Sequence, residues 1–332
     1  MDRFSPKLVT VFGGSGFVGT HLAQALARAG YRIRLAVRRP DLAGDAKMLG
    51  GVGQIVPIQA NVRNEASVQR AVAGADMVIN LVGLGYEGGK QTFAAVNTDG
   101  AGAIARAAKS AGVSALVHVS ALGADTAAEV SDYAASKLAG EQAVLEAFPQ
   151  AVILRPSLIF GHGDGFFNKM GFLARMLPVM PVISGASRFQ PVHVGDVADA
   201  IVAAAEGKVK TGRVYELGGP NVETHKDLLA RVLRETGRKR PLVALPSGIA
   251  KLLALPFAIL PAAPLVTADQ IELLGVDNVV SDAAIKDKRT LAAFGITPTS
   301  MDTILPQYMW RFSKHGQFDR PKTGDVSLAN SR

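Results

Sequence analysis

The stretch that decides the fold runs from residue 9 to residue 19 and reads Val9-Thr10-Val11-Phe12-Gly13-Gly14-Ser15-Gly16-Phe17-Val18-Gly19. A short apolar run followed by a glycine-rich turn and a new apolar run predicts a buried strand, a tight turn and the start of a helix. Glycine at 13 or 14 permits the turn, Gly16 lets the backbone approach a ligand, and Gly19 lets the helix pack on the strand. Because the N–H groups of a first helical turn face an anion, the stretch predicts a site for a dinucleotide pyrophosphate.

Short apolar runs alternate with amphipathic stretches through the first half of the chain. This alternation is typical of a parallel sheet with helices on both faces. It predicts the α/β class, with a Rossmann-type doubly wound parallel sheet and a smaller, interleaved C-terminal lobe. The expected strands are Leu8–Phe12, Ile33–Val37, Ile55–Ile58, Met77–Leu81, Ala115–Ser120 and Ala151–Leu154. The expected helical stripes lie at 18–29, Val68–Val72, Thr98–Ser110 and Tyr133–Ala147.

The alternation ends after Pro156, where glycine and proline become frequent, and it returns briefly over 189–219. We therefore expect residues 1–160, with 189–219 returning to them, to form the nucleotide-binding domain. Residues 161–188 and 220–332 are expected to form the smaller lobe and the C-terminal tail, which would contact a substrate or a partner.

The composition excludes several classes of protein. The chain has 332 residues, no cysteine and six histidines without metal-ligand spacing, so we expect no disulfide, no thiol catalysis and no metal. The net charge of +8 suits an anionic membrane surface or an acidic partner. No nucleic-acid motif accompanies this charge, so nucleic acid is not expected. The first strand begins within a few residues of Met1, which leaves no room for a targeting segment and predicts a cytosolic start.

Two arginines, Arg38 and Arg39, follow the second predicted strand, where an NAD-binding chain usually places an acid. Guanidinium groups suit a 2′-phosphate, so the expected cofactor is NADPH; the alternative is that both arginines are simply solvated. Asn61 and Val62 follow the third strand and would meet the adenine. The full expected cofactor set is Gly13, Ser15, Gly16, Phe17, Val18, Gly19, Arg38, Arg39, Asn61, Val62, Leu81, Val82, Gly83, Ser120, Tyr133 and Lys137.

A second group of residues could carry chemistry. Ser120 ends the fifth predicted strand, and Tyr133 and Lys137 lie one turn apart on one face of the next helix. An ammonium lowers the pKa of a nearby phenol, and the phenol can then exchange a proton while hydride moves. If the protein is active, Ser120, Tyr133 and Lys137 are the expected catalytic residues.

These motifs, together with Leu154-Arg155-Pro156-Ser157 and Pro191-Val192-His193-Val194-Gly195-Asp196, resemble an extended or atypical short-chain dehydrogenase/reductase. Extended reductases commonly carry paired serines after the fifth strand, whereas here Ala121 follows Ser120. Arg155, His193 and Asp196 fit a structural role as well as a catalytic one.

A narrower resemblance is to the NADPH-binding, reductase-like accessory subunit of respiratory complex I, the NADH:ubiquinone oxidoreductase. It rests on Val119-Ser120-Ala121-Leu122-Gly123-Ala124, on 133–141, and on the tail Ile304-Leu305-Pro306-Gln307-Tyr308-Met309-Trp310-Arg311-Phe312 with 316–318. The resemblance implies a structural NADPH held by Gly13, Gly16, Gly19, Arg38 and Lys137. It also implies complex I partners near the quinone-binding region.

The resemblance therefore implies a peripheral subunit without turnover, on the cytoplasmic side of a bacterial inner membrane. Residues 234–266 combine basic side chains with a proline-broken apolar segment, which predicts contact with a membrane surface or a subunit. An ordinary helix in the smaller lobe is the alternative for that segment. The alternative function is a free-standing NADPH-dependent reductase or epimerase that uses the Tyr133 and Lys137 pair.

Overall fold

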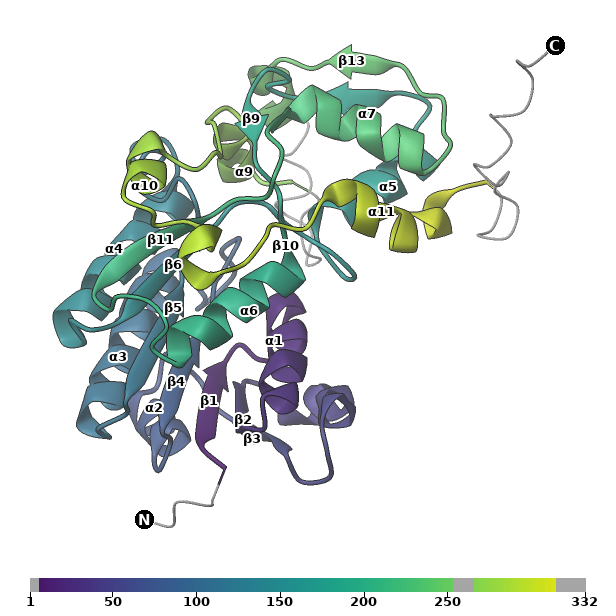
Figure 1. The fold of residues 1–332 in the computed structure, drawn as a ribbon. Coiled ribbons are helices and arrows are strands. Elements are labelled where there is room, and N and C mark those ends of the chain that lie inside the picture. The colour runs from purple at the N-terminus through teal and green to yellow at the C-terminus, as the bar shows by residue number, and fades with distance from the viewer. Residues whose placement is uncertain (1–5, 253–265, 315–332) are drawn as a thin grey trace.

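The computed structural model describes residues 6–252 and 266–314. Its centre is one seven-stranded parallel sheet with the strand order β11-β6-β5-β4-β1-β2-β3 (Figure 1). The strands are β1 (Leu8–Phe12), β2 (Arg32–Val37), β3 (Ile55–Gln59), β4 (Met77–Asn80), β5 (Ala115–Val119), β6 (Val152–Pro156) and β11 (Arg213–Leu217). This arrangement confirms the predicted fold class.

Helices cover both faces of the sheet. They are α1 (Phe17–Arg28), α2 (Glu65–Val72), α3 (Asp99–Ser110), α4 (Asp132–Ala147) and α6 (Val194–Ala205), with shorter helical segments η1 (Pro40–Leu49) and η2 (Ala94–Thr98). On one face, Leu22 and Leu26 of α1 share a core with Ile201 of α6 and the sheet. On the other face, buried apolar side chains of α2, α3 and α4 pack against the sheet in a second core. The inner strands β1, β4, β5 and β6 are thus shielded from water on two sides, which explains their near-continuous apolar runs, whereas Val56 on the edge strand β3 is exposed.

Two helices begin earlier than the apolar pattern predicted, because a capping side chain fixes the start of each. The predicted Val68–Val72 helix begins earlier because the Asn64 side chain accepts the Ser67 N–H. Ser131 caps α4 in the same way, through the Ala134 N–H. Both are N-caps that satisfy an otherwise free backbone donor.

A smaller lobe stands over the carboxyl ends of the strands. Its helices bury Phe160, Phe167, Leu228 and Tyr308 in a separate apolar core. The elements of this part of the chain are β7 (Ile159–Phe160), α5 (Phe166–Met176), β8 (Met180–Val182), β9 (Arg188–Phe189), β10 (Val192–His193), β12 (Glu223–Thr224), α7 (His225–Glu235), β13 (Leu242–Ala244), α9 (Ala268–Leu273), α11 (Met301–Met309) and η4 (Trp310–Phe312).

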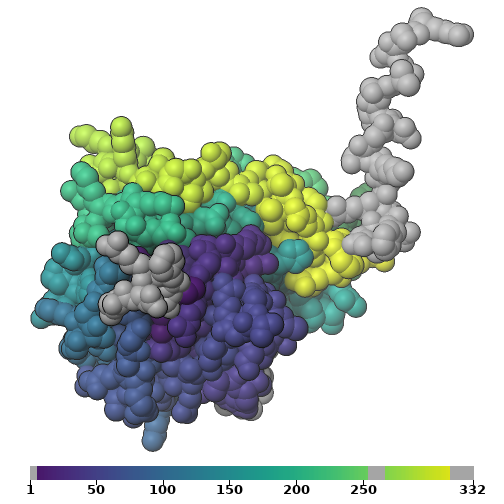
Figure 2. Space-filling view, turned by 60° about the horizontal axis from the view of Figure 1, so that its bottom comes forward, coloured from purple at the N-terminus to yellow at the C-terminus, as the bar shows by residue number. Residues whose placement is uncertain are grey.

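Between α9 and α11 the chain returns to the main sheet through α10 (Asp282–Lys286) and η3 (Leu291–Phe294). Phe294 lies edge-on against Tyr215 of β11, with ring centroids 5.1 Å apart. Arg289 donates a hydrogen bond to the Val214 carbonyl at 2.8 Å. Figure 2 accordingly shows yellow residues from late in the chain and purple residues from its start on one face of the molecule. The predicted division into two domains remains a prediction.

Part of the predicted basic and apolar region 234–266 can be described. Arg238 donates to the Phe312 carbonyl at 2.7 Å, and Arg240 donates to the Ala174 carbonyl at 3.3 Å. Residues 253–265 lie outside the described residues, as do the predicted tail positions 316–318. Within 6–252 and 266–314, no helix has the length and hydropathy that a bilayer crossing requires.

Candidate nucleotide-binding site

The glycine turn between β1 and α1 has the geometry that the sequence predicted. Gly13 adopts φ of +79°, and an ideal Cβ there would lie 3.2 Å from the Leu81 carbonyl carbon. At Gly19 an ideal Cβ would lie 2.6 Å from the Gly13 oxygen, so α1 can approach the turn only without a side chain. No side chain caps α1 at Gly16. The first N–H groups of α1 therefore remain available to an anion.

A cavity of about 270 Å³ opens beside this turn at the carboxyl edge of the sheet. Its described lining contains two arginines and neither aspartate nor glutamate. The lining residues are Gly13, Ser15, Gly16, Ala36, Val37, Arg38, Ala60, Asn61, Val62, Arg63, Leu81, Val82, Gly83, Leu84, Gln91 and Val96. Nine of these positions are in the cofactor set expected from the sequence. The other seven members of that set do not line the cavity: Phe17, Val18, Gly19, Arg39, Ser120, Tyr133 and Lys137.

The two consecutive arginines have different surroundings. Arg38 lines the cavity and donates a hydrogen bond to the Gln91 side chain. Arg39 instead forms an exposed ion pair with Asp41 at 2.8 Å. Arg63, which sequence reasoning missed, lines the same cavity as Arg38. Its position just after β3, next to the strand that carries Arg38, was the available signal.

Lys137 does not line this cavity but lies close to Gly83, which does. Its side chain is buried, and Nζ donates to the Val119 carbonyl at 2.9 Å. The ideal Cβ position of Gly83, a cavity residue, is 3.9 Å from Nζ. Burial lowers the pKa of Lys137 to about 8, although the carboxylate of Glu141 acts in the opposite direction. The lysine can therefore donate hydrogen bonds toward a ligand at the Gly83 end.

Tyr133 lies one helical turn before Lys137 and lines a second cavity of about 260 Å³. Burial raises the pKa of Tyr133 to about 12, and the negative charge of Asp269 adds to the shift. The phenol is therefore protonated at neutral pH. Ser120 is also buried, and its Oγ has no hydrogen-bond partner among the described residues. A buried hydroxyl without a partner is a group that a ligand can satisfy.

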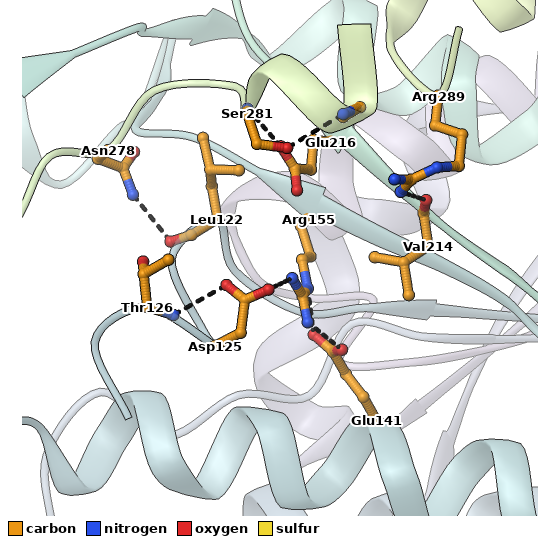
Figure 3. Close-up of polar contacts among 11 residues, drawn as sticks. Leu122, Asp125, Thr126, Glu141, Arg155, Val214, Glu216, Asn278, Ser281 and Arg289 are labelled. Atoms are coloured by element: carbon orange, nitrogen blue, oxygen red, sulfur yellow. Dashed lines mark hydrogen bonds and ion pairs between the residues drawn. The ribbon is translucent and has the colours of Figure 1, made fainter. Parts of the chain in front are cut away.

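Arg155 forms ion pairs with two carboxylates. The sequence alone did not decide whether its role is structural or catalytic. Arg155 donates to Glu141 at 2.9 and 2.8 Å and to Asp125 at 2.5 Å (Figure 3). Burial alone would lower the pKa of Arg155, but the hydrogen bonds that it donates to the two carboxylates raise it. Asn278 donates to the Leu122 carbonyl at 2.8 Å in the same region. These contacts hold the loop between β5 and α4, which leads into Tyr133.

The remaining candidates contact neighbouring polypeptide. Asp196 accepts hydrogen bonds from the Thr299 N–H and hydroxyl, at 2.7 and 2.8 Å. His193 lies 3.7 Å from the Asp196 carboxylate. Across the part of the chain that the structure describes, no three His, Asp or Glu side chains gather as a set that could hold a metal ion.

Comparison with known proteins supports a nucleotide-binding fold of this kind. The family model described as the NAD dependent epimerase/dehydratase family matches residues 9–218. The solved structure of gox2253 superimposes with a TM-score of 0.70 at 23% identity, covering 94% of this chain and 99% of that one, and shows the same fold. The chain therefore belongs to the NAD dependent epimerase/dehydratase family, whose cofactor class is a nicotinamide nucleotide.

Within that family, the chain is a relative of NADH dehydrogenase (ubiquinone) 1 alpha subcomplex subunit 9, mitochondrial. The Arabidopsis thaliana protein of that name is 38% identical over 292 residues, which cover 84% of this chain and 72% of the relative. The resemblance predicted from the sequence is thereby confirmed. Ceramide reductase of Caulobacter vibrioides is also 38% identical, over 196 residues that cover 59% of this chain and 60% of that protein.

Proposed function

We propose that this chain is a reductase-like accessory subunit of respiratory complex I that binds NADPH and has no turnover of its own. The observation that carries the proposal is the 38% identity to a mitochondrial subunit named for that complex, over 84% of the chain. Similarity over this length includes the smaller lobe as well as the nucleotide-binding sheet. A nucleotide that binds only the folded chain would stabilise that fold without any turnover.

The choice of NADPH over NADH is supported by charge. Arg38 lines the cavity at the end of β2, where an NAD-binding chain would present an acid to the ribose hydroxyls. The described lining has no carboxylate to accept a hydrogen bond from a 2′-hydroxyl. Gly13, Ser15 and Gly16 would face the pyrophosphate, and Lys137 would donate to the nicotinamide ribose. When bound, the nicotinamide supplies or accepts a hydride.

We further propose that the protein is peripheral, on the cytoplasmic side of a bacterial inner membrane and near the quinone-binding region of the complex. Support comes from basic side chains at the end of α7 and in the segment that follows it, including Arg234, Arg238 and Arg240. Exposed apolar side chains occur nearby in the chain, at Ile249 and Leu252. Cationic and apolar groups together suit an anionic bilayer surface or an acidic subunit.

Affinity purification from the source organism tests the proposal. A tagged chain, extracted from membranes in mild detergent, is expected to bring the core subunits of complex I with it and to release NADPH on denaturation. The proposal would be contradicted if the tagged chain were recovered alone and complex I from the same membranes were intact without it.

A second candidate, a free-standing NADPH-dependent reductase or epimerase, is favoured by one observation. Tyr133 is protonated at neutral pH, lines a cavity and lies one turn from Lys137 on α4. That arrangement can give a proton to a carbonyl oxygen. Steady oxidation of NADPH with a carbonyl substrate, lost in Tyr133→Phe but kept in the exposed control Tyr86→Phe, would establish this function instead.

A further inference from the structure

We propose that Arg63 is a specificity-determining residue that holds the 2′-phosphate of NADP(H) together with Arg38. The inference rests on the proposed binding of a nicotinamide nucleotide in the cavity beside the glycine turn. It assigns the second guanidinium to the end of β3 rather than to Arg39, the chain neighbour of Arg38.

The sheet brings the two arginines to one edge. β2 and β3 are adjacent parallel strands, with Val37 paired to Gln59 and the Ala60 N–H bonded to the Val37 carbonyl at 2.8 Å. Arg38 directly follows β2, and Arg63 follows β3 after a short turn. Since the carboxyl ends of parallel strands share an edge, two residues 25 positions apart line one cavity.

The turn after β3 is fixed by its own side chain. Asn61 Oδ1 accepts the Arg63 N–H at 3.1 Å, and the Asn61 N–H donates to the Ser67 hydroxyl at 3.1 Å. An asparagine that bonds the backbone two residues later forms a local turn. This turn sets the position from which the Arg63 side chain extends.

Both guanidinium groups reach the same pair of consecutive residues. Arg63 donates to the Lys90 carbonyl at 2.7 Å, and Arg38 donates to the Gln91 side chain. Lys90 and Gln91 belong to a tight turn closed by hydrogen bonds between Gly88 and Gln91, each 3.0 Å long. The two cationic groups therefore converge on one small region beside the cavity, where their partners are neutral oxygens.

A phosphate is a stronger partner than either neutral oxygen. Hydrogen bonds between guanidinium and phosphate are charge-assisted and frequently bidentate, so a 2′-phosphate would replace the contacts to Lys90 and Gln91. Arg39 is less available for this role because Asp41 engages it in an ion pair at 2.8 Å. A nucleotide without the 2′-phosphate gains nothing from Arg63.

The test compares four single variants by isothermal titration with NADPH and with NADH. Arg63→Gln and Arg38→Gln are each expected to weaken NADPH binding at least tenfold and to change NADH binding less than twofold. Arg70→Gln, an exposed position on α2, is the charge-matched control and is expected to bind like the wild type. Arg39→Gln is expected to weaken NADPH binding less than threefold.

Two different failures can be told apart. If the wild type binds neither nucleotide, the proposed binding of NADPH is wrong, and the role of Arg63 falls with it. If the wild type prefers NADPH and Arg63→Gln binds it unchanged, or loses NADH affinity equally, Arg63 does not hold the 2′-phosphate. A thermal melt of each variant, expected within 2 °C of the wild type, shows that an affinity loss is not a folding loss.

Discussion

The guanidinium of Arg155 on β6 donates two hydrogen bonds to the carboxylate of Glu141 on α4, with N···O distances of 2.9 and 2.8 Å (Figure 3). Both side chains are buried, and the pair joins a sheet strand to the helix that carries Tyr133 and Lys137. A pair of this kind costs desolvation free energy but fixes the position of one element on another. Arg155 is therefore placed as a residue that orients α4.

Arg155→Met is expected to lower the free energy of unfolding by about 3–5 kcal/mol, because it leaves the Glu141 carboxylate buried without its partner. The double variant Arg155→Met/Glu141→Leu is expected to recover most of that loss. Urea unfolding followed by circular dichroism measures both. Arg106→Met, which breaks an exposed pair with Glu65, is the control and should cost at most about 1 kcal/mol. Equal losses in the buried and exposed variants would contradict the orienting role.

Because Lys137 is buried, we expect the free energy of unfolding to increase as the pH is raised above about 8. Its pKa is about 8 in the folded chain against an ordinary value of 10.5. Between these values the unfolded chain binds a proton that the folded chain has released, so the free energy of unfolding rises with pH. Below pH 8 both states are protonated and the folded state bears the full desolvation cost.

We expect this contribution to be roughly 2 kcal/mol between pH 7.5 and 9.5, and to be absent in Lys137→Met. Denaturation at a series of pH values measures the slope. Lys109→Met, at an exposed position on α3, should keep the slope of the wild type. An unchanged slope in Lys137→Met would show that the lysine is not the titrating group.

Gly19→Ala tests the close packing of α1 on the glycine turn. The added Cβ would lie 2.6 Å from the Gly13 oxygen and from two Gly14 backbone atoms, so the helix or the turn must move. We expect a loss of about 1–3 kcal/mol in stability and at least tenfold weaker binding of NADPH. Thermal melts with and without nucleotide measure both effects. Gly44→Ala meets no atom within 4 Å and should change neither.

Tyr308→Phe tests how α11 is held. The Tyr308 hydroxyl donates to the buried carboxylate of Asp164, and burial raises the pKa of both groups. Because the acceptor is a carboxylate, the loss is expected to be about 1.5–3 kcal/mol. Tyr215→Phe removes a hydrogen bond to the neutral Lys210 carbonyl and should cost about 1 kcal/mol. Hydrogen exchange should rise in α11 for the first variant alone, and equal protection in both would contradict the anchoring role of Asp164.

Much of the fold was predictable because its signals are local. The strands β1, β2, β3, β4 and β5 lie within one residue of their predicted bounds. Helix starts were less accurate, since a capping side chain such as Asn64 or Ser131 acts outside the apolar stripe. The return of 281–299 to the main sheet was not predicted, because nothing in its local pattern distinguishes it from the chain around it.

The sequence by itself determined the strand, the glycine turn and the helix, because glycine spacing and apolar period act over a few residues. It also determined the chemistry available, namely arginine rather than acid after the second strand, and a tyrosine and lysine one helical turn apart. Only the tertiary structure decided which side chains share a cavity. Arg63 joins Arg38 because strand order makes β2 and β3 neighbours, and Asp41 engages Arg39 beside it. Such choices depend on contacts between segments, which no local pattern encodes.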